Sequence, residues 1–335
     1  MKKKILFIIG GGFLVCGILA GAGWAYLNSS PMEAGRSYLY HVRSGSGFYE
    51  VAGDLSGEGV IRSIQFFKFL GKLRDVSSHI QAGYYYLDSG MSAGEILDVL
   101  TAGKAYSVRV TFPEGKENKD FARILAAKGL VKEEEFLAAA NNPNALRESG
   151  LGSVLPAAKS AEGFLFPDTY MIPWGSSAEE IVRMMLANFK RQVGSERIAA
   201  MEQSSAGLHK AIILASIVER EAATPAERPR IAGVFANRVR IGMKLESCAT
   251  IQYIIGEVRL KLYYSDLKRE SPYNTYLYAG YPAGPICNPG LSSIKAAADP
   301  EAHDYLYFVS RNDGTHVFSK TLNEHNRAAR EFQGD

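Results

Sequence analysis

An uncharged stretch of 23 residues, Ile5 to Leu27, follows three lysines at the N-terminus. A transmembrane helix needs about 20 predominantly apolar residues, so this stretch is long enough to span a bilayer. The alternative is a cleaved signal peptide, whose apolar core is usually about 7–15 residues and ends in an A-x-A site that is not evident here. We expect an uncleaved, single-pass anchor over 5–27, a cytoplasmic tail over 1–4, and a linker over 28–37 leading to a domain outside the membrane.

The composition is that of a folded chain, with 47% hydrophobic and 22% charged residues. The net charge of +3 is too small to indicate nucleic acid as a partner. Three cysteines form neither a disulfide framework nor a zinc-ligand spacing. Cys248 and Cys287 can pair only if the fold brings them together, and two buried free thiols are the favoured interpretation.

An internal repeat occurs at an offset of 70 residues. Gly45, Val51, Ala52, Leu55 and Gly59 align with Gly115, Phe121, Ala122, Leu125 and Gly129. Each copy predicts a strand, a glycine turn and a helix that ends at a glycine. The strands are expected near 38–43 and 106–112, with a further strand over 81–87 and a capped helix over 92–100.

The second half of the sequence is more helical. Apolar residues at helical spacing predict helices over 178–191, 209–222 and 228–241, with short ones over 294–298 and 322–332. Two strand-like segments, 304–309 and 316–318, flank Asn312-Asp-Gly314, which is typical of a hairpin turn. Helices combined with a few antiparallel strands predict an α+β fold.

The segment Ala215-Ser-Ile-Val-Glu-Arg-Glu221 combines an apolar helix face with two carboxylates. Ile212, Ser216 and Glu219 lie on one face. If that face meets a cleft, burial disfavours the charged form of Glu219 and prepares it to act as a general acid. The alternative is a helix end with solvated charges, and spacing alone favours it.

Two aromatic segments could contact sugar rings. Glu162-Gly-Phe-Leu-Phe-Pro-Asp-Thr-Tyr170 combines rings with a carboxylate, and Asn274 stands between Tyr273 and Tyr276. Rings at such positions also fill hydrophobic cores, and an Asn often stabilises a turn, so both interpretations stay open. The six histidines show no zinc pattern and no G-x-S-x-G motif occurs, so we expect no metal and no cofactor.

Ordered motifs across the second half resemble the endolytic murein transglycosylases of the YceG/MltG type. The resemblance rests on the two segments above and on Gly233–Val239 with Gly242–Leu245, Pro272–Tyr276, Pro282–Gly290 with Ser293–Ala297, and Tyr305–Val309 through His316–Phe318 to His325-Asn326. It implies a LysM-like module over 38–104 and a catalytic domain over 105–333. It also implies a bacterial inner-membrane location with a periplasmic catalytic domain, and peptidoglycan synthases as partners.

The resemblance further implies cleavage of the β-1,4 bond between N-acetylmuramic acid and N-acetylglucosamine in nascent glycan strands, leaving 1,6-anhydromuramic ends. The essential glutamate of the family is expected at Glu219. Candidate substrate-binding residues come from the same motifs: Glu162, Phe166, Glu221, Tyr273, Asn274, Tyr276 and Asn288.

The chain departs from the family at one motif. Where members read L-Q-[ST]-D-P-T, this chain has Leu245-Glu-Ser-Cys-Ala-Thr250, so Cys248-Ala249 replaces Asp-Pro. Two alternative functions stay open. One is a muramidase that uses water, with Glu162 or Glu221 as the second carboxylate. The other is a non-catalytic scaffold that binds peptidoglycan.

Overall fold

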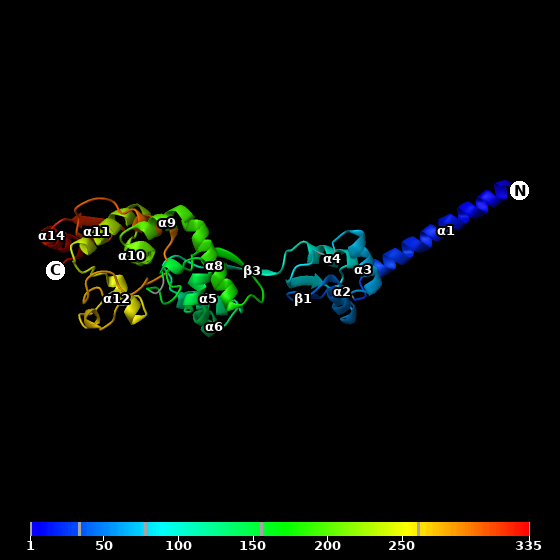
Figure 1. The fold of residues 1–335 in the computed structure, drawn as a ribbon, viewed down its shortest axis with the longest axis horizontal. Helices are drawn as coiled ribbons and strands as arrows, with labels where there is room; N and C mark the ends of the chain where they lie inside the picture. The colour runs from blue at the N-terminus through cyan, green and yellow to red at the C-terminus, as the bar shows by residue number, and fades with distance from the viewer. Residues whose placement is uncertain (1, 33–34, 77–78, 155–156, 260–261, 335) are drawn as a thin grey trace. The chain divides into compact units, whose positions relative to one another are not determined.

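The computed structural model describes residues 2–32, 35–76, 79–154, 157–259 and 262–334. The chain forms two compact units, one made of residues 1–108 and 171–175 and the other of 109–170 and 176–335 (Figure 1). The described residues form mostly helices, with three two-stranded sheets. The predicted α+β class is therefore confirmed, whereas the predicted domain limits at 38–104 and 105–333 stay a prediction.

The N-terminal stretch is helical, as predicted: α1 runs over Lys2–Asn28. Among the residues that the structure describes, no helix is both long enough and apolar enough to cross a membrane. The expected span 5–27 includes residues 5–10 and 13, whose side chains lie outside this description. The membrane anchor therefore stays a prediction.

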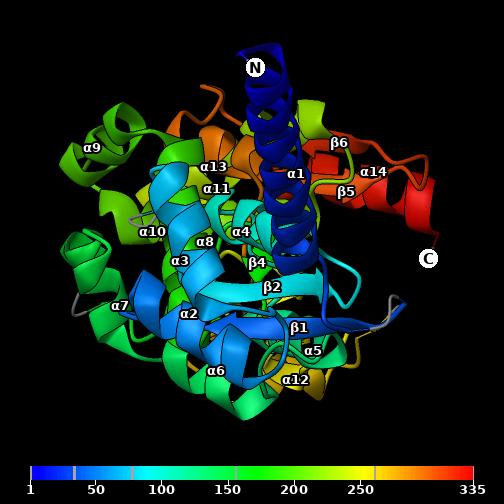
Figure 2. The same cartoon turned by 90° about the vertical axis from the view of Figure 1, so that its right-hand side faces the viewer.

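The first unit is a small sheet with three helices. Strands β1 (Ser37–Val42) and β2 (Gly83–Asp88) pair antiparallel, with Tyr40 opposite Tyr85. Helices α2 (Phe48–Gly57), α3 (Ile64–Leu73) and α4 (Ala93–Thr101) enclose one apolar core with this sheet (Figure 2). Ser92 caps α4 through a capping box with Glu95, as the sequence predicted.

The predicted repeat is confirmed in its local geometry. Helix α2 buries Val51, Ala52 and Leu55, and α5 (Asn118–Ala127) buries the three residues 70 positions further on. Both helices are followed by a glycine with positive φ, Gly59 at 70° and Gly129 at 67°. In both, the amide after that glycine bonds back to the last buried leucine, which closes the helix in the same way.

Most of the remaining elements lie in the second unit. They are α6 (Glu133–Ala140), α7 (Pro143–Glu148), α8 (Ala178–Val193), α9 (Ser195–Gln203), α10 (Gly207–Glu221), α11 (Arg228–Arg240), α12 (Cys248–Ile255), α13 (Leu291–Ala298), β5 (Tyr307–Ser310), β6 (His316–Ser319) and α14 (Leu322–Gln333). Strand β3 (Ser107–Thr111) pairs with β4 (Thr169–Pro173). The predicted hairpin is confirmed, because β5 and β6 pair antiparallel around Asn312, whose φ is +62°.

Helix α10 is the central helix of the second unit. Every residue from Ala211 to Val218 is buried, and α9, α11, α12 and α13 pack against the helix. Ser216 donates to Ile213 O within the helix and accepts from the amide of Ile286, so its hydroxyl is satisfied inside the core. Helix α10 is therefore a rigid support, and after the buried run its last turn carries three charged side chains.

Candidate active site

The last turn of α10 carries Glu219, Arg220 and Glu221 where the buried part of the helix ends. The helix stops after Glu221, where the amide of Ala222 closes the last turn on Val218 O. The chain then enters a 3-10 turn that begins at Pro225, a residue that cannot continue an α-helical ladder. Three charged side chains thus leave a rigid support in different directions.

Glu219 is held in a buried ion pair. Its Oε1 lies 3.1 Å from Arg228 Nη2, and its Oε2 accepts a hydrogen bond of 3.0 Å from the amide of Gly290. The Glu219 side chain is 6% exposed and that of Arg228 12%. Since Arg228 begins α11 and Gly290 precedes α13, Glu219 joins three helices, and both of its oxygens are occupied by fixed donors.

Glu221 has a different environment. Its Oε1 accepts a hydrogen bond of 2.5 Å from Ser247 Oγ and a long one of 3.5 Å from the amide of Ala249. Its Oε2 has no hydrogen-bond partner within the described part of the chain. Glu221 lines a cavity of about 480 Å³, which we call the Glu221 cavity. One carboxylate oxygen is therefore oriented by the protein, while the other is unpaired among the described residues.

The walls of the Glu221 cavity combine aromatic rings with polar groups. The lining includes Phe235, Arg238, Glu246, Ser247, Cys248, Tyr276, Tyr307, Phe308, His316 and His325. Tyr276 Oη lies 3.1 Å from Cys248 Sγ. Burial raises the pKa of the Cys248 thiol, so the neutral form is favoured there. Rings that present a flat apolar face beside polar groups suit a sugar, which has apolar faces and hydroxyl edges.

Arg238 supports the polar side of this cavity. It donates to the carbonyl oxygens of Leu306 and Leu245 and lies 3.4 Å from a carboxylate oxygen of Glu246. Glu246 itself has a φ of +50°, a conformation that non-glycine residues rarely adopt. Burial lowers the pKa of Arg238, and its bonds to the backbone keep this cation where it can hold Glu246.

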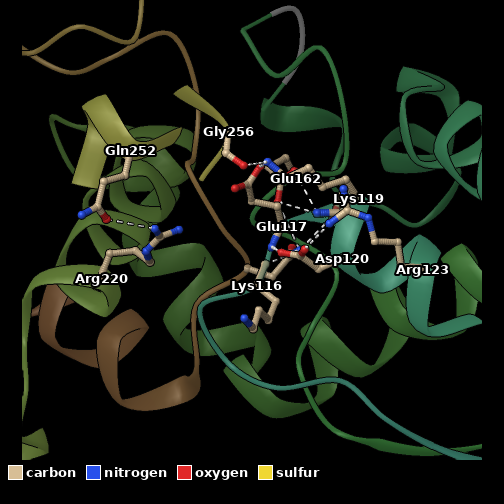
Figure 3. Close-up of polar contacts among 11 residues, drawn as sticks. Lys116, Glu117, Lys119, Asp120, Arg123, Glu162, Arg220, Gln252 and Gly256 are labelled. Carbon is tan, nitrogen blue, oxygen red and sulfur yellow. Dashed lines mark hydrogen bonds and ion pairs between the residues drawn. The ribbon is translucent and has the colours of Figure 1, made fainter. Parts of the chain in front are cut away.

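A second cavity, of about 420 Å³, lies at Glu219 and Arg220. This Glu219 cavity is lined by Glu114, Gly115, Lys116, Glu117, Lys119, Asp120, Arg123, Glu219, Arg220, Gln252, Gly256, Glu257 and Val258. Figure 3 shows part of it, with Arg220 joined to Gln252 and with Lys119 and Asp120 among paired charges. Burial and the charge of Glu219 raise the pKa of Glu114.

Sequence reasoning missed Glu114. Its carboxylate packs against Gly290, where any Cβ would collide with it. The next residue, Gly115, has a φ of +74°, donates to Asn288 O and lies against the Glu219 side chain. The segment Pro113-Glu-Gly-Lys116 lies directly between a predicted strand and a predicted helix, and this position could have indicated that Glu114 belongs to a site. The 70-residue repeat instead led us to interpret Gly115 only as part of a turn.

Asn288 and Glu162 form a buried polar framework. Asn288 Oδ1 accepts from the amides of Gly163 and Leu165, and its Nδ2 donates to Glu162 and Asn118. Both oxygens of Glu162 lie 3.1 Å from the amide of Asn118, at the start of α5. Burial is the main cause that raises the pKa of Glu162 to about 8. Their contacts are with the protein, and the predicted role of both in substrate binding stays untested.

The other predicted binding residues fall into three places. Phe166 is buried in the core, at 6% exposure. Asn274 is fully buried and bonds to Leu267 O, Arg269 O and the amide of Tyr276, which is the turn role that the sequence left open. Tyr273 lines a smaller cavity together with Glu162. Of the seven candidates, Glu221 and Tyr276 are brought together in the Glu221 cavity.

The cysteines are free, as the sequence favoured, but one is not buried. Cys287 is fully buried behind α10, whereas Cys248 is exposed at the Glu221 cavity. The expectation of two buried thiols is thus wrong for Cys248, because it begins α12 at the cavity wall rather than within the core.

Comparison with known proteins identifies the class. Residues 40–331 match the model of the YceG-like family. The chain is 32% identical to an endolytic murein transglycosylase of Bacillus subtilis (strain 168), over 97% of this chain and 91% of that protein. An endolytic murein transglycosylase of Streptococcus pneumoniae (strain D39) is 28% identical over 91% of this chain, which spans 61% of that longer protein.

A solved structure agrees with these matches. The crystal structure of a yceG-like protein from Listeria monocytogenes superposes with a TM-score of 0.60 at 31% identity, covering 88% of this chain and 99% of that one. The chain therefore belongs to the YceG-like family, and its relatives are named endolytic murein transglycosylases.

Proposed function

We propose that this chain is an endolytic lytic transglycosylase that cleaves β-1,4 bonds between N-acetylmuramic acid and N-acetylglucosamine in nascent peptidoglycan strands. Membership of the family and the names of its relatives support the substrate class. The observation that carries the proposal is the Glu221 cavity, which Glu221 lines together with aromatic rings and in which one of its oxygens has no hydrogen-bond partner among the described residues.

One carboxyl group is enough for this reaction. Protonated Glu221 gives its proton to the glycosidic oxygen as the bond from C1 of the muramic ring breaks. The 6-hydroxyl of the same ring then attacks C1, and Glu221 takes the hydroxyl proton. The products are an anhydromuramic end and a free 4-hydroxyl, with no water consumed. The attacking group belongs to the substrate, so proximity replaces a second protein carboxylate.

We assign the acid to Glu221, while Glu219, the residue expected from the resemblance, lines the neighbouring Glu219 cavity and remains the alternative. The Glu219 side chain is 6% exposed where it lines the Glu219 cavity, and both of its oxygens face donors that belong to the protein. An acid must reach the oxygen that it protonates to within hydrogen-bond distance. Glu221 lines a cavity large enough for a sugar ring, and its Oε2 has no hydrogen-bond partner within the described part of the chain, while Glu219 pairs with Arg228 near the helix end that carries Glu221.

A muramidase that uses water is the second candidate. Glu246 supplies the observation, because it places a second carboxylate on the wall of the Glu221 cavity. Its pairing with Arg238 favours a role in shaping the cavity over activation of water. Glu162 lines a different cavity and is therefore poorly placed to act as the second carboxylate of a muramidase.

We also propose that α1 anchors the chain in the inner membrane, with the second unit on the periplasmic side. The uncharged stretch after three lysines supports this topology. Leu14, Val15, Ile18 and Leu19 are all more than half exposed on α1, as lipid-facing side chains are. Protease treatment of intact spheroplasts tests the topology, since cleavage of the second unit by external protease is expected only if it lies outside.

The activity is tested by digesting isolated peptidoglycan with the purified full-length chain and analysing the products by mass spectrometry. We expect anhydromuramic ends from within strands, appearing as long fragments early in the digest. Products that are one water heavier, with reducing ends, establish the muramidase instead. Binding to peptidoglycan without any new ends establishes a scaffold and overturns both enzymatic candidates.

A further inference from the structure

Helix α3 in the first unit exposes apolar side chains that the proposed reaction does not use. Phe69 is 51% exposed and Leu73 61%, and the two lie one turn apart on the same face of the helix. The opposite side of α3 is buried in the core of the unit through Phe67 and Leu70. One face of this short helix therefore fills the core while the other presents large apolar groups to the surroundings.

The end of α1 adds an aromatic ring to these apolar groups. The indole of Trp24, which is 44% exposed, meets the rings of Phe66 and Phe69 edge to face, with centroids 5.2 and 6.1 Å apart. Figure 1 shows α1 entering the first unit beside α3. Trp24, Phe69 and Leu73 thus form one exposed apolar surface across two helices, which we call the Trp24 surface.

Hydrogen bonds join the end of α1 to the first unit. Asn28 Oδ1 accepts a hydrogen bond of 3.0 Å from the amide of Gly94, at the start of α4. Arg62, just before α3, donates a hydrogen bond of 2.7 Å to Ser30 O. The first residues of the predicted linker, 28–37, are therefore bonded to the unit, and these bonds support the contact between Trp24 and α3.

The position of Trp24 on α1 indicates what covers this surface. Trp24 lies three residues before Leu27, the end of the uncharged stretch, which is about 4.5 Å along a helix. Tryptophan is enriched where a membrane meets water, and Phe69 lies at the same level because it contacts Trp24. Helix α3 also carries Lys68 and Lys72 and no acidic residue, a charge that favours anionic headgroups.

We propose that the Trp24 surface docks on the outer leaflet of the membrane that α1 spans, with Lys72 beside the anionic phosphates of the phospholipid headgroups. This inference rests on the topology proposed above for α1 and goes beyond it. Lys72 is exposed and lies one turn from Phe69, so rings and charge share one face of α3. Apolar groups at the acyl boundary with cations at the headgroups are the arrangement of interfacial helices. The first unit is then held against the lipid by two helices.

Fluorescence quenching by labelled lipids tests the docking without any catalytic step. The full chain carries Cys16→Ala and Cys248→Ser, which remove its two exposed thiols. Leu73→Cys, Tyr86→Cys or Leu14→Cys is then added and labelled with a nitrobenzoxadiazole fluorophore. The proteins are placed in phosphatidylglycerol nanodiscs whose lipids carry a nitroxide near the headgroup or deep in the acyl chain. We expect the shallow nitroxide to quench position 73, the deep one to quench position 14, and neither to quench position 86.

Tyr86 is the matched control for the Trp24 surface. It is 51% exposed, as Phe69 is, but it lies on β2 between Tyr85 and Leu87, which face the core, so it points away from the core. With the fluorophore at position 73, Phe69→Ser is expected to lower the ratio of docked to undocked protein about tenfold, because an aromatic ring no longer enters the lipid. Tyr86→Ser is expected to leave that ratio unchanged.

The lipid charge tests the part assigned to Lys72. Lys72→Gln is expected to lower the same ratio about fivefold in phosphatidylglycerol nanodiscs, because one cation no longer meets an anionic surface. In phosphatidylcholine nanodiscs the substitution is expected to have no effect. A ratio that Lys72→Gln leaves unchanged in both lipids overturns the assignment of this lysine to the headgroups.

The quenching pattern separates this inference from the proposed anchor. Quenching at position 14 without quenching at position 73 leaves the anchor standing and overturns the docking of the Trp24 surface. Quenching at position 73 without quenching at position 14 supports the docking and overturns the anchor. Equal quenching at positions 73 and 86, or equal losses in Phe69→Ser and Tyr86→Ser, overturns the docking, because the contact is then not specific to this surface.

Discussion

The two carboxylates at the end of α10 lie two residues apart and have opposite surroundings. Glu219 is paired with Arg228 and bonded to Gly290 where it lines the Glu219 cavity, whereas Glu221 is held through one oxygen and lines the Glu221 cavity. Because successive residues on a helix point in different directions, one short motif can place two carboxylates in two different cavities. Similar side chains thus take different roles according to which partners the fold brings to them.

The largest effect is expected for Glu221→Gln. The amide keeps the size of the side chain and its contact with Ser247 but cannot donate a carboxyl proton, so the rate of anhydro-end formation should fall by about 10²–10⁴-fold. Product analysis by mass spectrometry measures the rate, and circular dichroism should show an unchanged fold. Activity close to that of the wild type removes Glu221 from the role of acid.

Glu219→Gln is expected to act on stability more than on chemistry. Loss of the charge leaves Arg228 buried without its counter-ion, which should lower the free energy of unfolding by about 2–4 kcal/mol. Chemical denaturation measures this, and activity below the unfolding transition should fall less than in Glu221→Gln. If Glu219→Gln is instead as stable as the wild type and inactive, Glu219 is the acid and Glu221 is not.

The polar framework behind the Glu219 cavity predicts a dependence of stability on pH. Glu162 has a folded pKa of about 8 against an ordinary 4.5, so between these values the folded state holds a proton that the unfolded state releases. Its contribution to stability is complete below about pH 4.5 and is lost as the pH rises to about 8. We expect Glu162→Gln to flatten this decline of unfolding free energy, which is on the order of a few kcal/mol over that range. If the unfolding free energy falls equally steeply with pH in the wild type and in Glu162→Gln, Glu162 is not the group responsible for the decline.

The smallest effect is expected at Cys248, on the Glu221 side. Its raised pKa leaves less thiolate than an ordinary exposed thiol at the same pH, so alkylation by iodoacetamide should be slow near neutrality and accelerate as the pH rises. Once attached to Cys248, the acetamide group should obstruct the Glu221 cavity and inhibit the formation of anhydro ends. Cys248→Ser should keep most activity and resist inhibition, whereas buried Cys287 should remain unmodified. If iodoacetamide inhibits Cys248→Ser as fast as the wild type, the group whose alkylation inhibits the enzyme is not Cys248.

Local sequence patterns predicted much of the fold. The 70-residue repeat located α2 and α5 through the same three buried positions and the same terminal glycine. This was possible because helix periodicity and a glycine at a helix end are local patterns, recognisable within a window of about ten residues. Helix α3 and the short helices α6, α7, α9 and α12 were not predicted. Each is at most ten residues long, and packing rather than local propensity stabilises helices of this length.

By itself, the sequence determined the family, the α+β class and the helix whose last turn carries two glutamates. It did not determine the partners of the two glutamates, because Arg228, Gly290 and Ser247 approach α10 from three other segments. Accessibility and ion pairing are properties of contacts between distant parts of the chain. Only the tertiary structure therefore decided that Glu219 pairs with Arg228 at the Glu219 cavity and that Glu221 bonds to Ser247 at the Glu221 cavity.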